Sequence, residues 1–372
     1  MPENRPRRLQ VLALVHLPPP LHGAAVVSAD VVASFLLNER FTIRTIPIQL
    51  GDSIERIGAL TLSKFVAVGR NVLSTLRALM TIRPDLVYVT LPPHGAGFYA
   101  GLPLIAVVKL FRRKILYHFH GRGVHDLARE LPHYRLLFRW AVRKADVICL
   151  SDRLVPDIVD FVEVGRIHCV PNYTDVEALD HSGSDPHHII FLSNIVETKG
   201  PMILLGALTL LHDQDISFRA TFAGATHPPF TAENFAREIA RRGLSHKVKY
   251  VGPVNATEKR SLLRSAGIFV LPTWNDAFPL TVLEAMAVGL PVVATPEGAI
   301  PDAVQHGVTG LIVPHKDVDA VAQALCRLLQ DPDAAREMGV LGYDRVKTNF
   351  SKNVFFEKIA NLWQLVASRV GE

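Results

Sequence analysis

Short apolar segments alternate along this sequence with longer segments of helical periodicity. Apolar runs typical of buried strands occur at Leu9–His16, Phe41–Ile48 and Asp85–Thr90, and the pattern restarts with Ile189–Leu192. Further strands are expected at Asp146–Leu150 and Ile167–Val170, and in runs ending at Gly224, Gly252 and Leu271. Strands that alternate with helices predict a parallel, doubly wound sheet with ligands at the carboxyl ends of its strands. The chain is therefore expected to be an α/β protein whose functional residues follow its strands.

Length and composition limit the possibilities further. With 372 residues, the chain is long for one hydrophobic core, so two domains are expected. Hydrophobic residues make up 49% of the sequence and charged residues 20%, which is typical of globular proteins. The three cysteines are scattered, which favours a reducing compartment over a disulfide framework. The short apolar run near the N-terminus enters a proline-rich loop and is interpreted as a first strand, not a signal peptide.

The stretch Leu271–Gly298 carries the most specific pattern. It predicts a strand ending at Leu271, a polar loop, a helix over Pro279–Val288, a Gly-Leu-Pro turn, a second strand and a glycine loop. A helix N-terminus suits a phosphate, whereas the carboxylates of Asp276 and Glu284 suit hydroxyl groups of a sugar or ribose. The alternative is a surface unit in which both carboxylates only cap and solvate the helix.

This stretch resembles the sugar-nucleotide signature of the family 4 retaining glycosyltransferases, of the glycosyltransferase group 1 type. In that signature two carboxylates flank seven residues and lead into a Leu-Glu-Ala-Met-Ala helix and a Gly-x-Pro-Val-Val strand. Here Asp276 takes the place of the usual first Glu, and Phe278-Pro279-Leu280 replaces the commoner Phe-Gly-Leu. The glycine loop Gly298–Asp302 and the turn Pro171–Asp175 also resemble family motifs.

The resemblance implies a GT-B fold, with two Rossmann-like domains facing across a cleft. It predicts an N-terminal acceptor-side domain over residues 1–175 and a C-terminal nucleotide-sugar-binding domain over 176–350. Residues 351–372 are expected to form a helix that crosses back to the N-terminal domain.

The resemblance also assigns roles in the second domain. Glu284 would hold the donor ribose, and Asp276 a hydroxyl of the transferred sugar. Lys199 would stabilise the leaving diphosphate together with the N–H groups around Leu280 and Thr281. Asn194 stands where the family has an arginine, five residues before the lysine, and cannot supply its charge.

In the first half, the resemblance singles out His120 and Gly23. His118 and His120 alternate at the end of the strand that begins at Ile115, so they should point to the same face. From the residues alone, both are strand-end histidines bonded to the backbone. The resemblance makes His120 the residue that positions the transferred sugar. Gly23, in a turn that opens a helix reaching about Leu37, would border the donor phosphate and the acceptor, and Arg122 is a further candidate for neutralising the anion.

No metal cofactor is expected. Asp213 and Asp215 lie in a loop after a helix, and Asp317 and Asp319 open a helix, where acidic residues favour the helix dipole. Two histidines without a third ligand are weak grounds for a metal site. The donor is a substrate and not a cofactor, so metal-independent chemistry is predicted.

Charge is unevenly divided along the chain. Residues 1–175 contain 22 Lys and Arg against 14 Asp and Glu, and Arg56–Arg83 contains no acidic residue. Arg56, Arg70 and Arg77 fall on one side of a helix, which fits either an interfacial helix on anionic lipid or an ordinary covering helix. Nucleic acid is not expected as a partner, because no recognition motif accompanies the charge. No membrane-spanning segment is evident, so the predicted location is cytoplasmic, with peripheral contact at the inner membrane face.

The predicted function is retaining transfer of a sugar, expected to be a hexosyl group, from a nucleotide diphosphate sugar to a glycan or lipid-linked acceptor in polysaccharide biosynthesis. Two alternatives stay open. One is a GT-B sugar-nucleotide epimerase, which would need acid and base residues that the sequence does not identify. The other is a non-catalytic nucleotide-sugar-binding or scaffold protein, suggested by Asn194 and Asp276.

Overall fold

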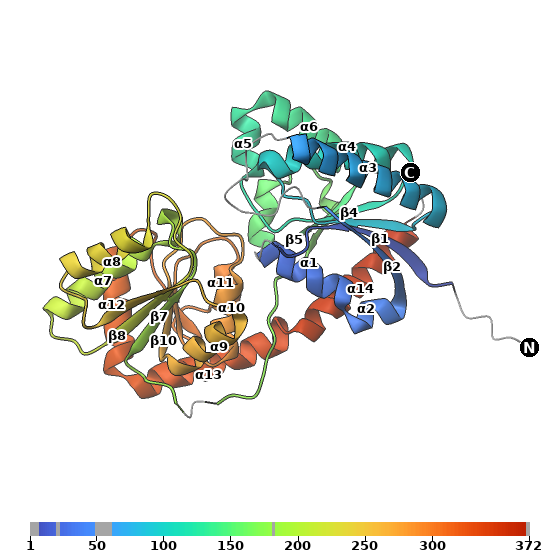
Figure 1. The fold of residues 1–372 in the computed structure, drawn as a ribbon. Coiled ribbons are helices and arrows are strands. Elements are labelled where there is room, and N and C mark those ends of the chain that lie inside the picture. Colours follow the sequence, from blue (N-terminus) through green and yellow to red (C-terminus); the bar gives the residue numbers. More distant parts are fainter. Residues whose placement is uncertain (1–6, 20–22, 49–61, 181–182, 370–372) are drawn as a thin grey trace, which may run out of the picture. The chain divides into compact units, whose positions relative to one another are not determined.

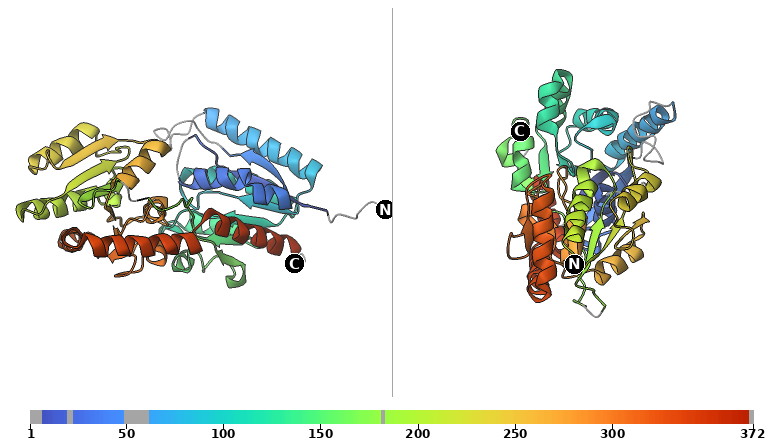
Figure 2. Two further views of the ribbon diagram at one scale, coloured as in Figure 1. Left: turned by 90° about the horizontal axis from the view of Figure 1, so that it is seen from below. Right: turned by 90° about the vertical axis from the view of Figure 1, so that its left-hand side faces the viewer.

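The computed structural model describes residues 7–19, 23–48, 62–180 and 183–369. By contacts the chain divides into two units, one of Met1–Asn172 with Asn353–Glu372 and the other of Tyr173–Lys352. Each unit contains a six-stranded sheet in which every described pairing is parallel (Figures 1 and 2). The α/β architecture predicted from the alternating pattern is confirmed.

The sheet of the first unit has the strand order β2-β1-β3-β4-β5-β6. Its strands are β1 (Leu9–Val15), β2 (Phe41–Pro47), β3 (Leu86–Val89), β4 (Ile115–His118), β5 (Asp146–Cys149) and β6 (Ile167–Cys169). Its helices are α1 (Gly23–Ala33), α2 (Phe35–Arg40), α3 (Leu62–Ile82), α4 (Gly95–Leu110), α5 (Val124–Glu130), α6 (Pro132–Val142), the 3₁₀ helices η2 (Asp152–Asp157) and η3 (Val164–Arg166), and α14 (Lys352–Ser368). The order reverses between β1 and β3.

Successive strand residues pack on opposite faces of this sheet, as the period of two requires. Val87 and Val89 join the core formed with α3, α4 and α6. Tyr88 points to the other face, where its ring lies 5.2 Å from that of Trp363 on α14. Figure 1 shows α3 and α4 on one side of the first sheet and α14 on the other.

One helix prediction in this unit was wrong. The apolar segment expected to run as a single helix to about Leu37 is divided into α1 and α2 at Ser34. The Ser34 hydroxyl accepts a hydrogen bond from the Leu37 N–H at 3.3 Å, so it caps a new helix. The break follows from this local bond, which an apolar pattern does not reveal.

The sheet of the second unit has the order β12-β11-β10-β7-β8-β9 and reverses between β7 and β10. Its strands are β7 (His188–Leu192), β8 (Arg219–Ala223), β9 (Val248–Gly252), β10 (Ile268–Leu271), β11 (Val292–Ala294) and β12 (Gly310–Ile312). Its helices are η4 (Glu197–Lys199), α7 (Pro201–Asp213), α8 (Ala232–Arg241), α9 (Ala256–Ser265), α10 (Leu280–Ala287), α11 (Ile300–Ala303), α12 (Val318–Gln330) and α13 (Pro332–Asn349). Within residues 7–19, 23–48, 62–180 and 183–369, no helix is both long and apolar enough to span a bilayer.

Candidate functional site

The second sheet brings two loops together at the point where its strand order reverses. One loop follows β7 and contains η4, and the other follows β10 and leads to α10. The Trp274 N–H donates to the Thr198 carbonyl oxygen at 2.9 Å, and the Thr273 hydroxyl donates to the same oxygen at 3.0 Å. Parallel sheets place their ligand sites at such a reversal. The loops therefore meet where a ligand is expected.

A glycine allows this close approach. Gly200 has φ +76°, and a Cβ atom there would lie 2.2 Å from the Pro272 carbonyl oxygen. Only glycine combines that left-handed backbone with so short a separation. Gly200 thus fixes Lys199, its neighbour, beside the loop that follows β10.

Lys199 and Asp276 form an ion pair at this position. The Lys199 ammonium group also donates to the Asn275 carbonyl oxygen at 3.1 Å. Both side chains are about one-fifth exposed, at 21% and 18%. Lys199 was assigned to the diphosphate and Asp276 to the sugar, and the structure places the two groups in direct contact. A ligand that uses both groups has to share or replace this pair.

Glu297, which was not singled out from the sequence, supports the loop that carries Asp276. The buried Glu297 carboxylate accepts a hydrogen bond from the Asp276 N–H at 3.2 Å and pairs with His315 at 3.2 Å. Next to it, Gly298 has φ +52°, and a Cβ there would lie 2.3 Å from the Ala277 carbonyl oxygen. The only signal in the sequence was the position of Glu297 in the loop that follows a predicted strand.

Glu284 lies on α10, four residues after the helix begins. One of its carboxylate oxygens forms an ion pair with Lys259 of α9. The other, Oε2, is buried and has no hydrogen-bond partner within the part of the chain that the structure describes. An unsatisfied buried acceptor is costly, so this oxygen is suited to receive a hydrogen bond from a ligand hydroxyl.

The start of α10 differs by one residue from the prediction. The helix begins at Leu280, and Pro279 is its N-cap instead of its first helical residue. No side chain within the described residues caps the helix, so the N–H groups of Leu280 and Thr281 lie at an uncapped, partially positive end. Asn194 is exposed in the loop after β7, and its carbonyl oxygen accepts from the Val196 N–H at 3.0 Å.

The first unit contains the other predicted site residues. β4 ends at His118, two residues before His120. The two rings share one face as predicted, with centroids 4.1 Å apart. His118 is fully buried beside the Tyr88 hydroxyl, 2.7 Å from its Nδ1. Burial first, and then the neighbouring His120, lower the pKa of His118 well below its ordinary value, so His118 is neutral near pH 7.

His120 is only half-buried, whereas Gly23 is the exposed first residue of α1. His16 lies at the end of β1 and was not singled out from sequence. Its Nδ1 lies 2.7 Å from the Thr90 carbonyl oxygen. The structure thus places His16, Thr90 and His120 just after strands of the first sheet, and Lys199, Asp276 and Glu284 in the second unit.

Asp317 lies at a helix start as the sequence suggested, whereas Asp213 is the last residue of a helix and not part of the loop that follows it. Asp317 caps α12, accepting from the Ala320 N–H at 2.8 Å, and Asp213 ends α7. Over the described residues, no group of three or more His, Cys, Asp or Glu side chains has the arrangement of a metal site.

Comparison with known proteins finds glycosyltransferases among the relatives of this chain. The D-inositol 3-phosphate glycosyltransferase of Corynebacterium diphtheriae is 31% identical over 176 residues, which cover 46% of this chain and 41% of that protein. The amylovoran biosynthesis glycosyltransferase AmsK of Erwinia amylovora is 30% identical over 280 residues, covering 70% of this chain and 66% of AmsK. The family model of the glycosyl transferases group 1 matches residues 186–331.

Through this segment the chain belongs to the group 1 glycosyltransferases. Asp276, Glu284 and the residues between them predicted a glycosyltransferase of the group 1 type, and this type is confirmed. The matched part amounts to about two-fifths of the first relative's length.

The fold of this group 1 glycosyltransferase is also that of solved structures. Anabaena Alr3699/HepE, in complex with UDP, superposes with a TM-score of 0.72 at 16% identity, covering 96% of this chain and 100% of that one. The predicted GT-B class, with two α/β domains, is thereby confirmed.

Proposed function

We propose that this protein is a retaining, family 4 glycosyltransferase that moves a hexosyl group from a nucleotide diphosphate sugar to a glycan or lipid-linked acceptor. The observation that carries the proposal is the arrangement in the second unit. An ammonium group, a carboxylate and an uncapped helix start follow the strands at the sheet reversal. A buried carboxylate oxygen that has no partner among the described residues lies on the same helix.

Each group matches one part of a nucleotide diphosphate sugar. Glu284 Oε2 accepts from a ribose hydroxyl, and the N–H groups of Leu280 and Thr281 face the diphosphate. When the donor binds, Lys199 pairs with diphosphate oxygens in place of Asp276. The Asp276 carboxylate can then accept a hydrogen bond from a sugar hydroxyl. Charge on the leaving diphosphate grows as the glycosidic bond breaks, so preorganised donors lower the barrier more than they strengthen ground-state binding.

The remaining assignments rest on the resemblance. His120 positions the transferred sugar, and Gly23 borders the donor phosphate and the acceptor. The reaction proceeds without a metal. The relatives support glycan synthesis as the setting, because AmsK is named for amylovoran biosynthesis. A uridine nucleotide is the first donor to test, since HepE has been solved with UDP and with UDP-glucose.

A thermal-shift panel of uridine, guanosine and adenosine diphosphate sugars tests the donor class. At about 100 times its dissociation constant, a specific donor should add roughly 2.7 kcal/mol of stability. Glu284→Gln should reduce that shift, because the amide is a weaker acceptor of a ribose hydroxyl than the carboxylate. The exposed Asp319→Asn should keep it. Absence of a shift with every donor would contradict the proposal, and donor binding without turnover would favour the non-catalytic alternative.

A further inference from the structure

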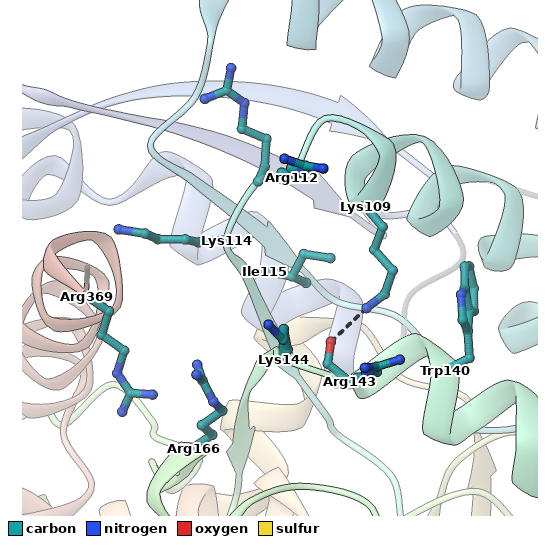
Figure 3. A pocket seen from close by; sticks show the side chains of 10 residues that line it. Lys109, Arg112, Lys114, Ile115, Trp140, Arg143, Lys144, Arg166 and Arg369 are labelled. Carbon is teal, nitrogen blue, oxygen red and sulfur yellow. Dashed lines mark hydrogen bonds between the residues drawn. The ribbon is translucent and has the colours of Figure 1, made fainter. Parts of the chain in front are cut away.

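A second charged site lies in the first unit, away from the residues described above. A cavity of about 820 Å³ opens there, and Figure 3 shows the side chains around it. Eight of the ten residues that line it are basic, and none is acidic among the residues that the structure describes. They are Lys109, Arg112, Arg113, Lys114, Arg143, Lys144, Arg166 and Arg369, together with Ile115 and Trp140. We call this cavity the basic pocket.

The basic pocket is assembled from four separate chain segments. Residues 109–115 lead from α4 into β4, and residues 140–144 lead from α6 into β5. Arg166 directly precedes β6, and Arg369 follows α14. Because the strands are parallel, their amino ends meet at one edge of the sheet. The basic pocket therefore lies at the edge opposite to His16 and His120.

Some of these cations have partners within the protein. Asp146 is almost fully buried and pairs with Arg369 at 3.0 Å and with Arg166 at 3.4 Å. Lys109 donates to the Arg143 carbonyl oxygen at 2.8 Å, as Figure 3 shows, and Lys114 donates to the Ala367 carbonyl oxygen. These bonds fix the positions of four of the eight basic side chains that line the basic pocket.

Helix ends and two acidic residues offset part of this charge. The C-terminal ends of α4, α6 and α14 contribute about half a negative charge each. Asp146 contributes one more, and Glu163, which pairs with Arg166 at 3.1 Å, another. Capping of helix ends, the ordinary explanation for such residues, supplies only about one and a half negative charges against eight cations.

Two further observations favour an anion as the ligand of the basic pocket. The Nε atom of Arg113 is buried and has no hydrogen-bond partner within the described residues. Burial first, and then the charge of Arg143, lower the pKa of Lys109 to about 8. Both features would be relieved by an anion in the basic pocket, because it would accept from the guanidinium and offset the repulsion between the cations.

We propose that the basic pocket binds a multiply charged, phosphate-bearing anion. Guanidinium groups recognise phosphate oxygens through paired hydrogen bonds, and several converge here. The cavity volume lies in the range of sites for whole small molecules, so a single inorganic phosphate would fill only part of it. The same chemistry is offered by a soluble polyphosphorylated molecule and by the headgroups of anionic lipid.

Calorimetric titration with inorganic tripolyphosphate tests the soluble source. The full-length protein should bind this probe, and Arg112→Gln/Arg143→Gln should weaken binding at least about 10-fold, since it removes two exposed cations from different segments. Arg129→Gln/Arg135→Gln removes the same charge from exposed positions of α5 and α6 outside the basic pocket and should keep the affinity. Lys199→Ala should also keep it, which separates this site from the donor site. Thermal melts check that each variant is folded.

Sedimentation with phosphatidylcholine vesicles, with and without phosphatidylglycerol, tests the lipid source. If a headgroup is the ligand, the wild type should bind only the anionic vesicles, and Arg112→Gln/Arg143→Gln should weaken this binding while the control pair retains it. Binding of neither probe would overturn the proposal. So would equal loss in the pocket variant and the control pair, because that would reflect net charge alone. Neither assay measures turnover. Failure of this proposal would therefore leave the proposed glycosyltransferase function untouched, and failure of that function would leave this proposal untouched.

Discussion

Single residues decide how the candidate donor site is held together. Lys199 and Asp276 form an ion pair, and Glu284 pairs with Lys259 through one oxygen only. The first pair could not be read from the sequence, because the two residues lie 77 positions apart. Lys259 was missed for a similar reason, since its contact depends on how α9 packs beside α10. Residue types at strand ends were predictable, but their partners were not.

Gly298 offers a test at the scale of one residue. Gly298→Ala should place a methyl group 2.3 Å from the Ala277 carbonyl oxygen and displace the loop that carries Asp276. The clash and the backbone strain at φ +52° should together lower the free energy of unfolding of the second unit by about 1–3 kcal/mol and weaken donor binding. Gly307→Ala is the matched control, because φ is +78° there but nothing lies within 4 Å of the new Cβ. Equal effects of the two changes on donor binding would contradict this role.

At the scale of elements, helix α3 exposes both apolar and basic side chains. Val66, Leu73 and Met80 are exposed apolar residues spaced seven apart, and Arg70 and Arg77 lie exposed between them. The spacing places all five on one side of the helix, the pattern of an interfacial helix. Of the three arginines predicted to cluster, Arg56 lies outside the described residues, and α3 continues through Gly69 without a break.

We propose that this face of α3 makes peripheral contact with anionic membrane. Each basic residue near such a surface contributes about 1 kcal/mol, so Arg70→Gln/Arg77→Gln should weaken sedimentation with phosphatidylglycerol-containing vesicles by roughly 30-fold. Wild-type binding should also fall as salt is raised. Leu73→Ser should weaken it further by removing apolar contact. Binding that is unchanged in these variants, or that is as strong to neutral vesicles, would exclude α3 as the membrane face.

Most elements were predictable because alternating apolar runs and helical periodicity determine them locally. β7 begins one residue before its predicted start and ends where predicted, and α14 begins one residue after its predicted start. The division of α1 from α2 was missed because it depends on a single hydroxyl, that of Ser34. The basic pocket was missed because its residues lie in turns before strands, whereas functional residues were sought after them.

At the scale of the whole molecule, the chain returns to its first unit for its last residues. Asn353–Glu372 belong to that unit by contacts, and Trp363 is fully buried there, 5.2 Å from the rings of both Phe41 and Tyr88. Residues from the two ends of the sequence thus share one core. The first unit is therefore complete only once α14 has been made.

Trp363→Ala should destabilise the first unit by about 3–5 kcal/mol, the usual cost of removing a large aromatic side chain from a core. Calorimetry should show a lowered transition for the first unit, while ligand-induced stabilisation of the second unit by donor is retained. Leu365→Ala, at a half-exposed position of the same helix, should change stability far less. Equal effects of the two substitutions would show that α14 does not complete this core.

Steady-state kinetics of donor use, measured in EDTA with the donor that gives the largest thermal shift, test the central claim most directly. Glu284→Ala should raise KM about 10- to 150-fold with little change in kcat, because the ribose contact is the same in the ground and transition states. Lys199→Ala should mainly lower kcat, because Lys199 faces charge that develops as the bond breaks. Wild-type kcat/KM in both folded variants would contradict the assignment of the site, and turnover that vanishes in EDTA and returns with manganese would contradict metal independence.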